Sequence, residues 1–162
     1  MPRPDEQSVR QDAIAAIQAW VDSQKDLDVR QETDAAWSTV LTGENKRTIG
    51  MVLGVGDQTL IVESHFMRAP DENADLLYRL LLTRNQRTYL LRFCVYDSGD
   101  IMIVGVVPLR AVTAGEMDRI AGALLNIADE TYNAALRLGF AGYIEREQAW
   151  RHSAGLGRNP IS

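Results

Sequence analysis

Residues 49–66 have the sequence IGMVLGVGDQTLIVESHF, and this stretch decides the fold. Apolar residues occupy every second position before Gly56-Asp57 and again after it, which is the period of a half-buried β-strand. The residues predicted to share one face are Ile49, Met51, Leu53 and Val55 on the first strand, and Leu60, Val62, Ser64 and Phe66 on the second. Because Gly56-Asp57 is a tight-turn sequence, the two strands are predicted to form an antiparallel hairpin.

A third strand is predicted just before this hairpin. Residues 37–41 alternate in the same way, and residues 42–45, with the sequence TGEN, form a turn signal. Three strands joined by short turns indicate an antiparallel meander.

Three helices are predicted around the strands. Ser8 and Gln11 have the spacing of a capping box, so a first helix is expected to begin at Ser8. Residues 70–72, Pro-Asp-Glu, are expected to open a second helix. Thr113 and Glu116 form a second capping box, which predicts the start of a long amphipathic helix.

Two further strands are predicted over residues 89–96 and 101–107, joined by the turn at residues 97–100. Residues 101–107 are apolar at both parities, so this strand is expected to be central and the most buried. The resulting order is α-β-β-β-α-β-β-α. It predicts an α+β fold in which helices pack on one face of a five-stranded antiparallel sheet.

The length of 162 residues is typical of one domain. We expect a polar lead-in over residues 1–7, a single domain over 8–152 and a flexible tail over 153–162. Within that domain, residues 140–150 are expected to form a last helical segment.

Composition and charge narrow the classes of partner. The net charge is −5, from 22 acidic and 17 basic residues without a basic block, which disfavours binding to nucleic acid. The longest apolar run, residues 101–107, is too short to span a bilayer, and residues 1–11 lack a secretory signal. A lone cysteine, Cys94, permits no internal disulfide. We therefore expect a cytoplasmic protein that does not bind membranes.

Several segments resemble the bacterial YbjN-like family, which is described as sensory transduction regulators. They are the run TLIVES at 59–64, the acidic helix start at 71–73, the strand at 89–95, and the strand at 101–107 with the long helix after it. The element order is also similar to that of class I type III secretion chaperones. The resemblance extends over residues 8–150 and implies a small acidic module, often dimeric, that binds other proteins. The family has no established catalytic residues to transfer.

No pattern in the sequence assembles a convincing catalytic or metal site. A thiolate–base pair of Cys94 and His65 is conceivable, but a cysteine in mid-strand usually packs as a small hydrophobe. The glycine turn at 54–57 lacks the third glycine and the following helix of a dinucleotide site. The acidic turn at 97–100 is too short for a calcium loop. We predict that the chain is not an enzyme and holds no metal or cofactor.

The remaining hypothesis is a protein-binding module, expected to be a homodimer, with a small-ligand sensor as the alternative. If helices cover one sheet face only, one face of residues 101–107 must be hidden by something else. The acidic stretch at 22–34 is either a solvated linker or a docking surface for a basic partner. Aromatic residues at 143 and 150 either pack on the core or form an interface. The predicted partner-binding residues are Met102, Val104, Val106, Tyr143 and Trp150.

Overall fold

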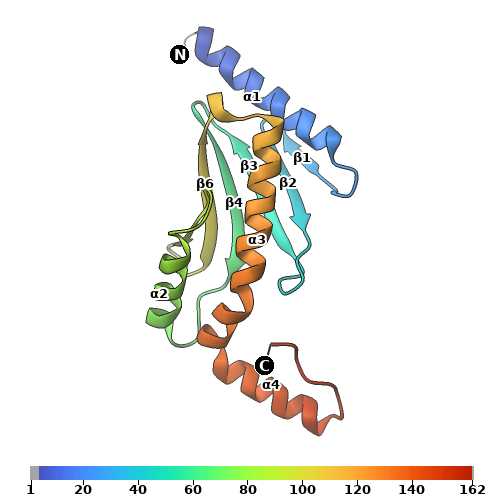
Figure 1. The fold of residues 1–162 in the computed structure, drawn as a ribbon, viewed down its shortest axis with the longest axis vertical. Helices are drawn as coiled ribbons and strands as arrows, with labels where there is room; N and C mark the ends of the chain where they lie inside the picture. The colour runs from blue at the N-terminus through green and yellow to red at the C-terminus, as the bar shows by residue number, and fades with distance from the viewer. Residues whose placement is uncertain (1–3, 162) are drawn as a thin grey trace.

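The computed structural model describes residues 4–161 and shows an antiparallel sheet of six strands with helices on one face (Figure 1). The strand order across the sheet is β1-β2-β3-β4-β6-β5. The strands are β1 (Arg30–Thr33), β2 (Ala36–Leu41), β3 (Ile49–Val55), β4 (Thr59–Met67), β5 (Arg92–Val95) and β6 (Ile101–Pro108). The helices are α1 (Pro4–Ser23), α2 (Ala74–Arg84), the short 3-10 turn η1 (Leu109–Ala111), α3 (Ala114–Gly139) and α4 (Ala141–Ser153).

The predicted α+β class and the one-sided helix layer are confirmed, but the sheet has six strands rather than five. The additional strand, β1, lies within the acidic stretch at residues 22–34, where the sequence pattern predicts no strand. All four of its residues are exposed, so it lacks the alternation that identifies a strand. It forms at the sheet edge by pairing with β2, with Arg30 opposite Ser38 and Gln31 opposite Trp37.

The β3–β4 hairpin has the predicted faces. The residues predicted to share one face of each strand are all buried, including Ser64. Val55 pairs with Leu60, and the turn closes through the Gly56 N–H, which donates to the Thr59 carbonyl at 2.9 Å. The hairpin therefore presents one apolar face to the helices and its other face outward.

Strand β6 differs from its prediction. It lies between β4 and β5 rather than at the centre of the sheet, and it is buried on one face only. Ile101, Ile103 and Val107 lie in the core, whereas Val106 on the opposite face is exposed. Because both faces of residues 101–107 are apolar, the sequence predicted that both faces would be covered. In the structure, the helices that cover the sheet all lie on one side of it (Figure 1).

The helix starts were predicted with mixed success. The predicted start at Ser8 is wrong, because α1 begins at Pro4 and Ser8 lies exposed within it. Helix α2 begins at Ala74, after Asn73 takes a left-handed conformation with φ of 50°. The capping box at α3 is confirmed for its first half, since the Thr113 hydroxyl oxygen accepts a hydrogen bond from the Glu116 N–H at 3.0 Å. The Glu116 carboxylate instead accepts a hydrogen bond from the hydroxyl of Tyr89.

Helix α3 lies across the sheet, and α1 crosses its upper end (Figure 1). The buried face of α3 comprises Met117, Ile120, Leu124, Ile127, Ala128, Thr131, Ala135 and Gly139. The predicted segment after α3 is a separate helix, α4, because the backbone turns at Phe140, with φ of −138°. Helix α4 has no buried residue and extends away from the sheet.

Residues 154–161 fold back on α4. The side-chain amide of Gln148 donates to the Asn159 carbonyl and accepts from the Asn159 N–H, both at 3.1 Å. The Asn159 side chain also donates to Glu147 at 2.7 Å. No helix within residues 4–161 is both long and apolar enough to cross a membrane.

Candidate interaction surfaces

The face of the sheet opposite the helices carries a patch of apolar side chains. We call it the open-face patch, and it consists of Val40, Val52, Ile61, Met102, Val104 and Val106. The exposed fractions are 54% for Val40, 47% for Val52, 41% for Ile61 and 54% for Val106. Glu63 lies between Val52 and Val104 on this face, and the exposed apolar side chains around it mark a candidate interaction site.

Two glycines lie beside this patch and leave the backbone of β3 uncovered, because they have no side chains. Gly50 and Gly54 lie on the outward parity of β3, and a Cβ built on either would meet no atom within 4 Å. A cavity of about 440 Å³ opens beside Gly50, with Val40 and Val52 in its lining. A partner's side chains could therefore approach the β2–β3 backbone closely.

A hydrogen bond between charged and polar groups crosses the patch. The Tyr96 hydroxyl donates to the Glu63 carboxylate at 2.6 Å. Tyr96 follows β5, and Glu63 pairs with Val104 of the intervening β6, so the tyrosine side chain spans β6. The hydrogen bond to Glu63 is the main cause that raises the pKa of Tyr96 to about 12, with burial as a smaller cause.

The predicted partner-binding residues fall into two groups. Met102, Val104 and Val106 lie on the open face of β6, the first two half-buried and the third exposed. Tyr143 and Trp150 lie on α4 and are 53% and 60% exposed. Neither aromatic residue is packed in the core, so the alternative in which α4 buries them does not describe this structure.

Sequence reasoning missed the part of the open face outside β6. Val40, Val52 and Ile61 have the outward parity on β2, β3 and β4. The sequence did contain a sign of this surface. Valine and isoleucine occupy outward positions at which a solvated strand usually carries polar residues. Only the strand order brings them together, since Ile61 pairs with Val106 across β4 and β6.

A second apolar surface lies at the β5 edge of the sheet, beside α2. Leu82 and Val95 are exposed there, and we call these two residues the edge surface. A cavity of about 220 Å³ lies next to them, lined by Tyr78, Leu81, Leu82, Phe93, Cys94 and Val95. Strand β5 pairs with β6 on one side, and within residues 4–161 no strand lies along its outer edge.

The strand register separates the two residues of the conceivable thiolate–base pair. Met102 pairs with both His65 and Cys94, which therefore lie on strands two apart, at about 10 Å. Burial and the nearby Glu63 carboxylate raise the pKa of the Cys94 thiol. His65 instead has Asp100 as its partner, with Nε2 and Oδ2 3.4 Å apart. This arrangement does not activate Cys94 as a nucleophile.

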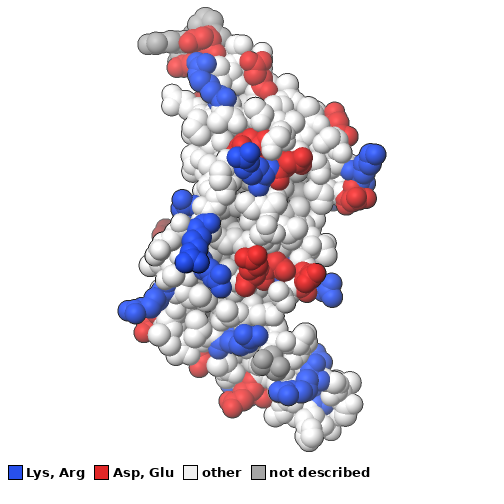
Figure 2. All heavy atoms as spheres, in the orientation of Figure 1, with Lys and Arg blue, Asp and Glu red and all other residues white. Residues whose placement is uncertain are grey.

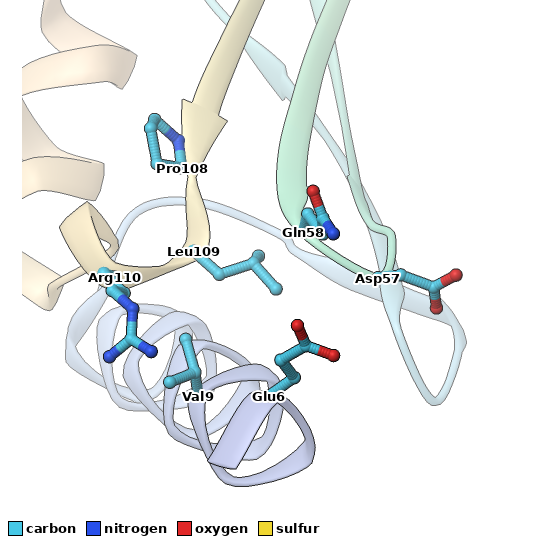
Figure 3. Close-up of a pocket in the computed structure, with 7 residues that line it drawn as sticks. All are labelled: Glu6, Val9, Asp57, Gln58, Pro108, Leu109 and Arg110. Carbon is cyan, nitrogen blue, oxygen red and sulfur yellow. The ribbon is translucent and has the colours of Figure 1, made fainter. Parts of the chain in front are cut away.

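Another cavity, of about 320 Å³, lies between the first half of α1 and the β3–β4 turn. Figure 3 shows Glu6 and Val9 of α1 facing Gln58 and Leu109 across it. The helix is attached near this cavity by Arg10, whose Nε donates to the Gly56 carbonyl at 3.1 Å. The helix-covered face of the molecule shows acidic and basic side chains interspersed, without a field of one sign (Figure 2).

Solved structures define the class of the fold. The chain is similar to a chain of the ExoU–SpcU heterodimer from the type III secretion system of Pseudomonas aeruginosa, with 15% identity, a TM-score of 0.53, and coverage of 77% of this chain and 98% of that one. It is similar to a chain of the HopA1–SchA chaperone–effector complex, with 11% identity, a TM-score of 0.51, and coverage of 78% and 95%. It is also similar to a chain of the ExsC–ExsE complex, with 16% identity, a TM-score of 0.50, and coverage of 83% of this chain and 96% of that one. The fold is that of the type III secretion chaperones.

Within that class, the chain belongs to the YbjN family. The family model, described as "Putative bacterial sensory transduction regulator", matches residues 13–137. Protein Rv0487 of Mycobacterium tuberculosis is 44% identical over 115 residues, which are 71% of this chain and 63% of that protein. Protein ML2442 of Mycobacterium leprae is 36% identical over 121 residues, 75% and 66% of the two chains. The chain thus spans slightly less than two thirds of the length of these relatives.

Proposed function

We propose that this chain is a cytoplasmic, non-catalytic protein-binding module of chaperone-like or regulatory type. The observation that carries the proposal is the open-face patch, which places apolar side chains from four strands on an uncovered sheet. We assign the function to the domain expected over residues 8–152. The solved complexes support it, because each contains a chain of this fold together with a different protein.

The open face suits an apolar segment of a partner. Val52, Ile61 and Val106 offer a surface at the middle of the sheet, and the bare backbone of β3 leaves room for bulky side chains beside them. Burying exposed apolar area is worth roughly 25 cal/mol per Å² before the costs of association. Exposed polar groups such as Arg92 and Glu32 lie toward the sheet edges, as in the polar rim of an interface.

The test is affinity capture from the native lysate with quantitative mass spectrometry. The bait would be the wild type, Val106→Glu, and Leu156→Glu as a matched control, because Leu156 is also exposed but lies in the tail. We expect one or more proteins to be captured by the wild type and the control and lost with Val106→Glu. Equal capture by all three baits would show that the open face is not the binding surface.

For the homodimer we propose the edge surface as the contact between copies. Leu82 is 66% exposed, and with Val95 it forms an apolar surface separate from the open face. A two-fold interface would place each α2 against the same region of the second copy. Sedimentation should give a dimer for the wild type and for Leu156→Glu, and a monomer for Leu82→Glu. A dimer that persists in Leu82→Glu would exclude this contact.

A further inference from the structure

A cavity of about 630 Å³ lies where β4, α3, α4 and the folded-back tail meet. Its apolar lining comprises Phe66, Met67, Tyr132, Leu136, Phe140, Tyr143, Ile144 and Ile161. Its polar lining comprises Lys46, His65, Arg68, Glu147 and Asn159. The volume is within the range of small-molecule sites, which combine mostly apolar walls with a few polar groups.

One charged group in this lining has no partner of opposite charge among the described residues, namely Lys46. Arg68 forms a salt bridge with Asp71 at 2.7 Å, His65 is 3.4 Å from Asp100, and Glu147 is paired with Arg151 at 2.9 Å. Lys46 lacks such an ion pair and places its ammonium 4.8 Å from the centre of the Tyr132 ring. Burial lowers the pKa of Lys46, because it removes water from around the ammonium group.

The apolar wall leads away from this ammonium along α3. Tyr132, Leu136 and Phe140 follow at four-residue steps, so they form one stripe about 12 Å long at 1.5 Å per residue. Ile144 of α4 and Ile161 of the tail continue the lining. A ligand that fits would have an anionic group at the Lys46 end and an apolar body along the stripe.

We propose that this cavity binds a small carboxylic acid with an apolar tail, held by Lys46 at the head and by the Tyr132–Phe140 stripe along the body. A small molecule is favoured over an extended peptide because no lining residue belongs to the edge strands β1 and β5. β4 has strand partners on both sides, so the cavity offers no free strand edge to pair with a peptide backbone. The site gives the sensor alternative a location and does not depend on the open face.

The test is titration of the full chain with octanoate, followed by NMR signals of the Met67, Leu136 and Ile144 methyl groups. We expect saturable shifts confined to the cavity, and weaker binding of the uncharged analogue 1-octanol. Lys46→Met keeps an unbranched apolar stem and removes the charge, so the octanoate dissociation constant should rise about tenfold or more. Lys25→Met, at an exposed lysine in the loop after α1, is the matched control and should bind as the wild type does.

Three results would overturn the proposal. They are the absence of saturable shifts, equal binding of octanoate and 1-octanol to the wild type, and shifts at Val52 and Val106 rather than in the cavity. The comparison of the two ligands needs no variant, so it holds even if Lys46→Met folds poorly. Val106→Glu should retain octanoate binding, which separates this site from the proposed protein-binding function.

Discussion

The indole N–H of Trp20 donates a hydrogen bond of 2.8 Å to the carboxylate of Asp118, which joins α1 to α3. Trp20 is 1% exposed, whereas Asp118 is at the surface and also accepts from the side-chain amide of Gln24 at 3.3 Å. The contact links residues 98 positions apart and sets the two helices that cover the sheet against each other. It allows the largest side chain of α1 to be buried without leaving its N–H unpaired.

Asp118→Ala should therefore destabilise the fold. Removing the acceptor leaves the Trp20 N–H unpaired, and we expect a loss of about 1–2 kcal/mol in the free energy of unfolding. Asp118→Asn keeps an oxygen at the same place and should lose clearly less. Urea denaturation followed by circular dichroism measures both variants, and equal losses would show that the hydrogen bond is not what the carboxylate contributes.

Asp129 of α3 should stabilise the loop between β2 and β3. Its carboxylate accepts from the backbone N–H groups of Asn45 at 2.7 Å and Lys46 at 2.8 Å. We expect Asp129→Ala to lose about 1–2 kcal/mol at neutral pH by urea denaturation, since these are hydrogen bonds to a partly exposed charged acceptor. Glu130→Ala, at the exposed neighbouring residue, should lose little.

The stabilisation from Asp129 should also depend on pH. Burial acts to raise the pKa of Asp129, but the backbone N–H groups of Lys46, Asn45 and Glu44 outweigh it and hold the pKa below its ordinary value of 3.8. A depressed pKa means that the stabilisation is present above pH 3.8 and is lost as pH falls through the lower folded-state value. The difference between wild type and Asp129→Ala should shrink in that acid range. A difference that stays constant would contradict the assignment.

Tyr96 should lose its hydroxyl proton at a higher pH than an ordinary tyrosine, because its hydroxyl donates a hydrogen bond to Glu63. Its pKa of about 12, against an ordinary 10.0, means that the folded state keeps a proton that the unfolded chain has released. Stability should fall as pH rises from 10 towards 12. NMR of the tyrosine ring carbons should show Tyr96 titrating with a pKa of about 12, and Glu63→Gln should move the Tyr96 pKa down towards 10.0. An unchanged Tyr96 pKa in Glu63→Gln would exclude the carboxylate as the cause.

Two buried threonines should respond oppositely to the same substitution. The Thr131 hydroxyl on α3 is buried without a hydrogen-bond partner among the described residues, so Thr131→Val should be neutral or stabilise the fold by up to about 1 kcal/mol. Thr39 donates to the Asp28 carbonyl at 2.9 Å, so Thr39→Val should cost about 1 kcal/mol. Thermal unfolding of the two variants tests the pair. Equal destabilisation would indicate that Thr131 has a partner after all.

Local patterns in the sequence were sufficient for the hairpin and for the start of α3. The alternation in 49–66 fixes which residues of β3 and β4 share a face, because a strand has a strict period of two. The Thr113–Glu116 pair marks a helix start because capping is a contact within four residues. Such features depend on near neighbours along the chain, and for that reason the class of fold could be predicted.

Strand β1 and the start of α1 could not be predicted in the same way. All of the β1 residues are exposed, so it exists only because β2 lies beside it. The capping-box spacing at Ser8 is compatible with a helix start, but the helix continues back to Pro4. Strand β1 depends on pairing with a neighbouring strand, which its own residues do not indicate. The start of α1 depends on competing local signals.

By itself, the sequence determined the α+β class, which residues of β3 and β4 share a face, and the apolar character of both faces of β6. Only the tertiary structure decided that Ile101, Ile103 and Val107 face the helices and that Met102, Val104 and Val106 face outward. The tertiary structure also brings the Asp129 carboxylate to the loop at residues 44–46 and the Lys46 ammonium to the face of the Tyr132 ring. The physical reason is that periodicity fixes which side chains share a face, whereas the cover on that face comes from elements far away in the chain.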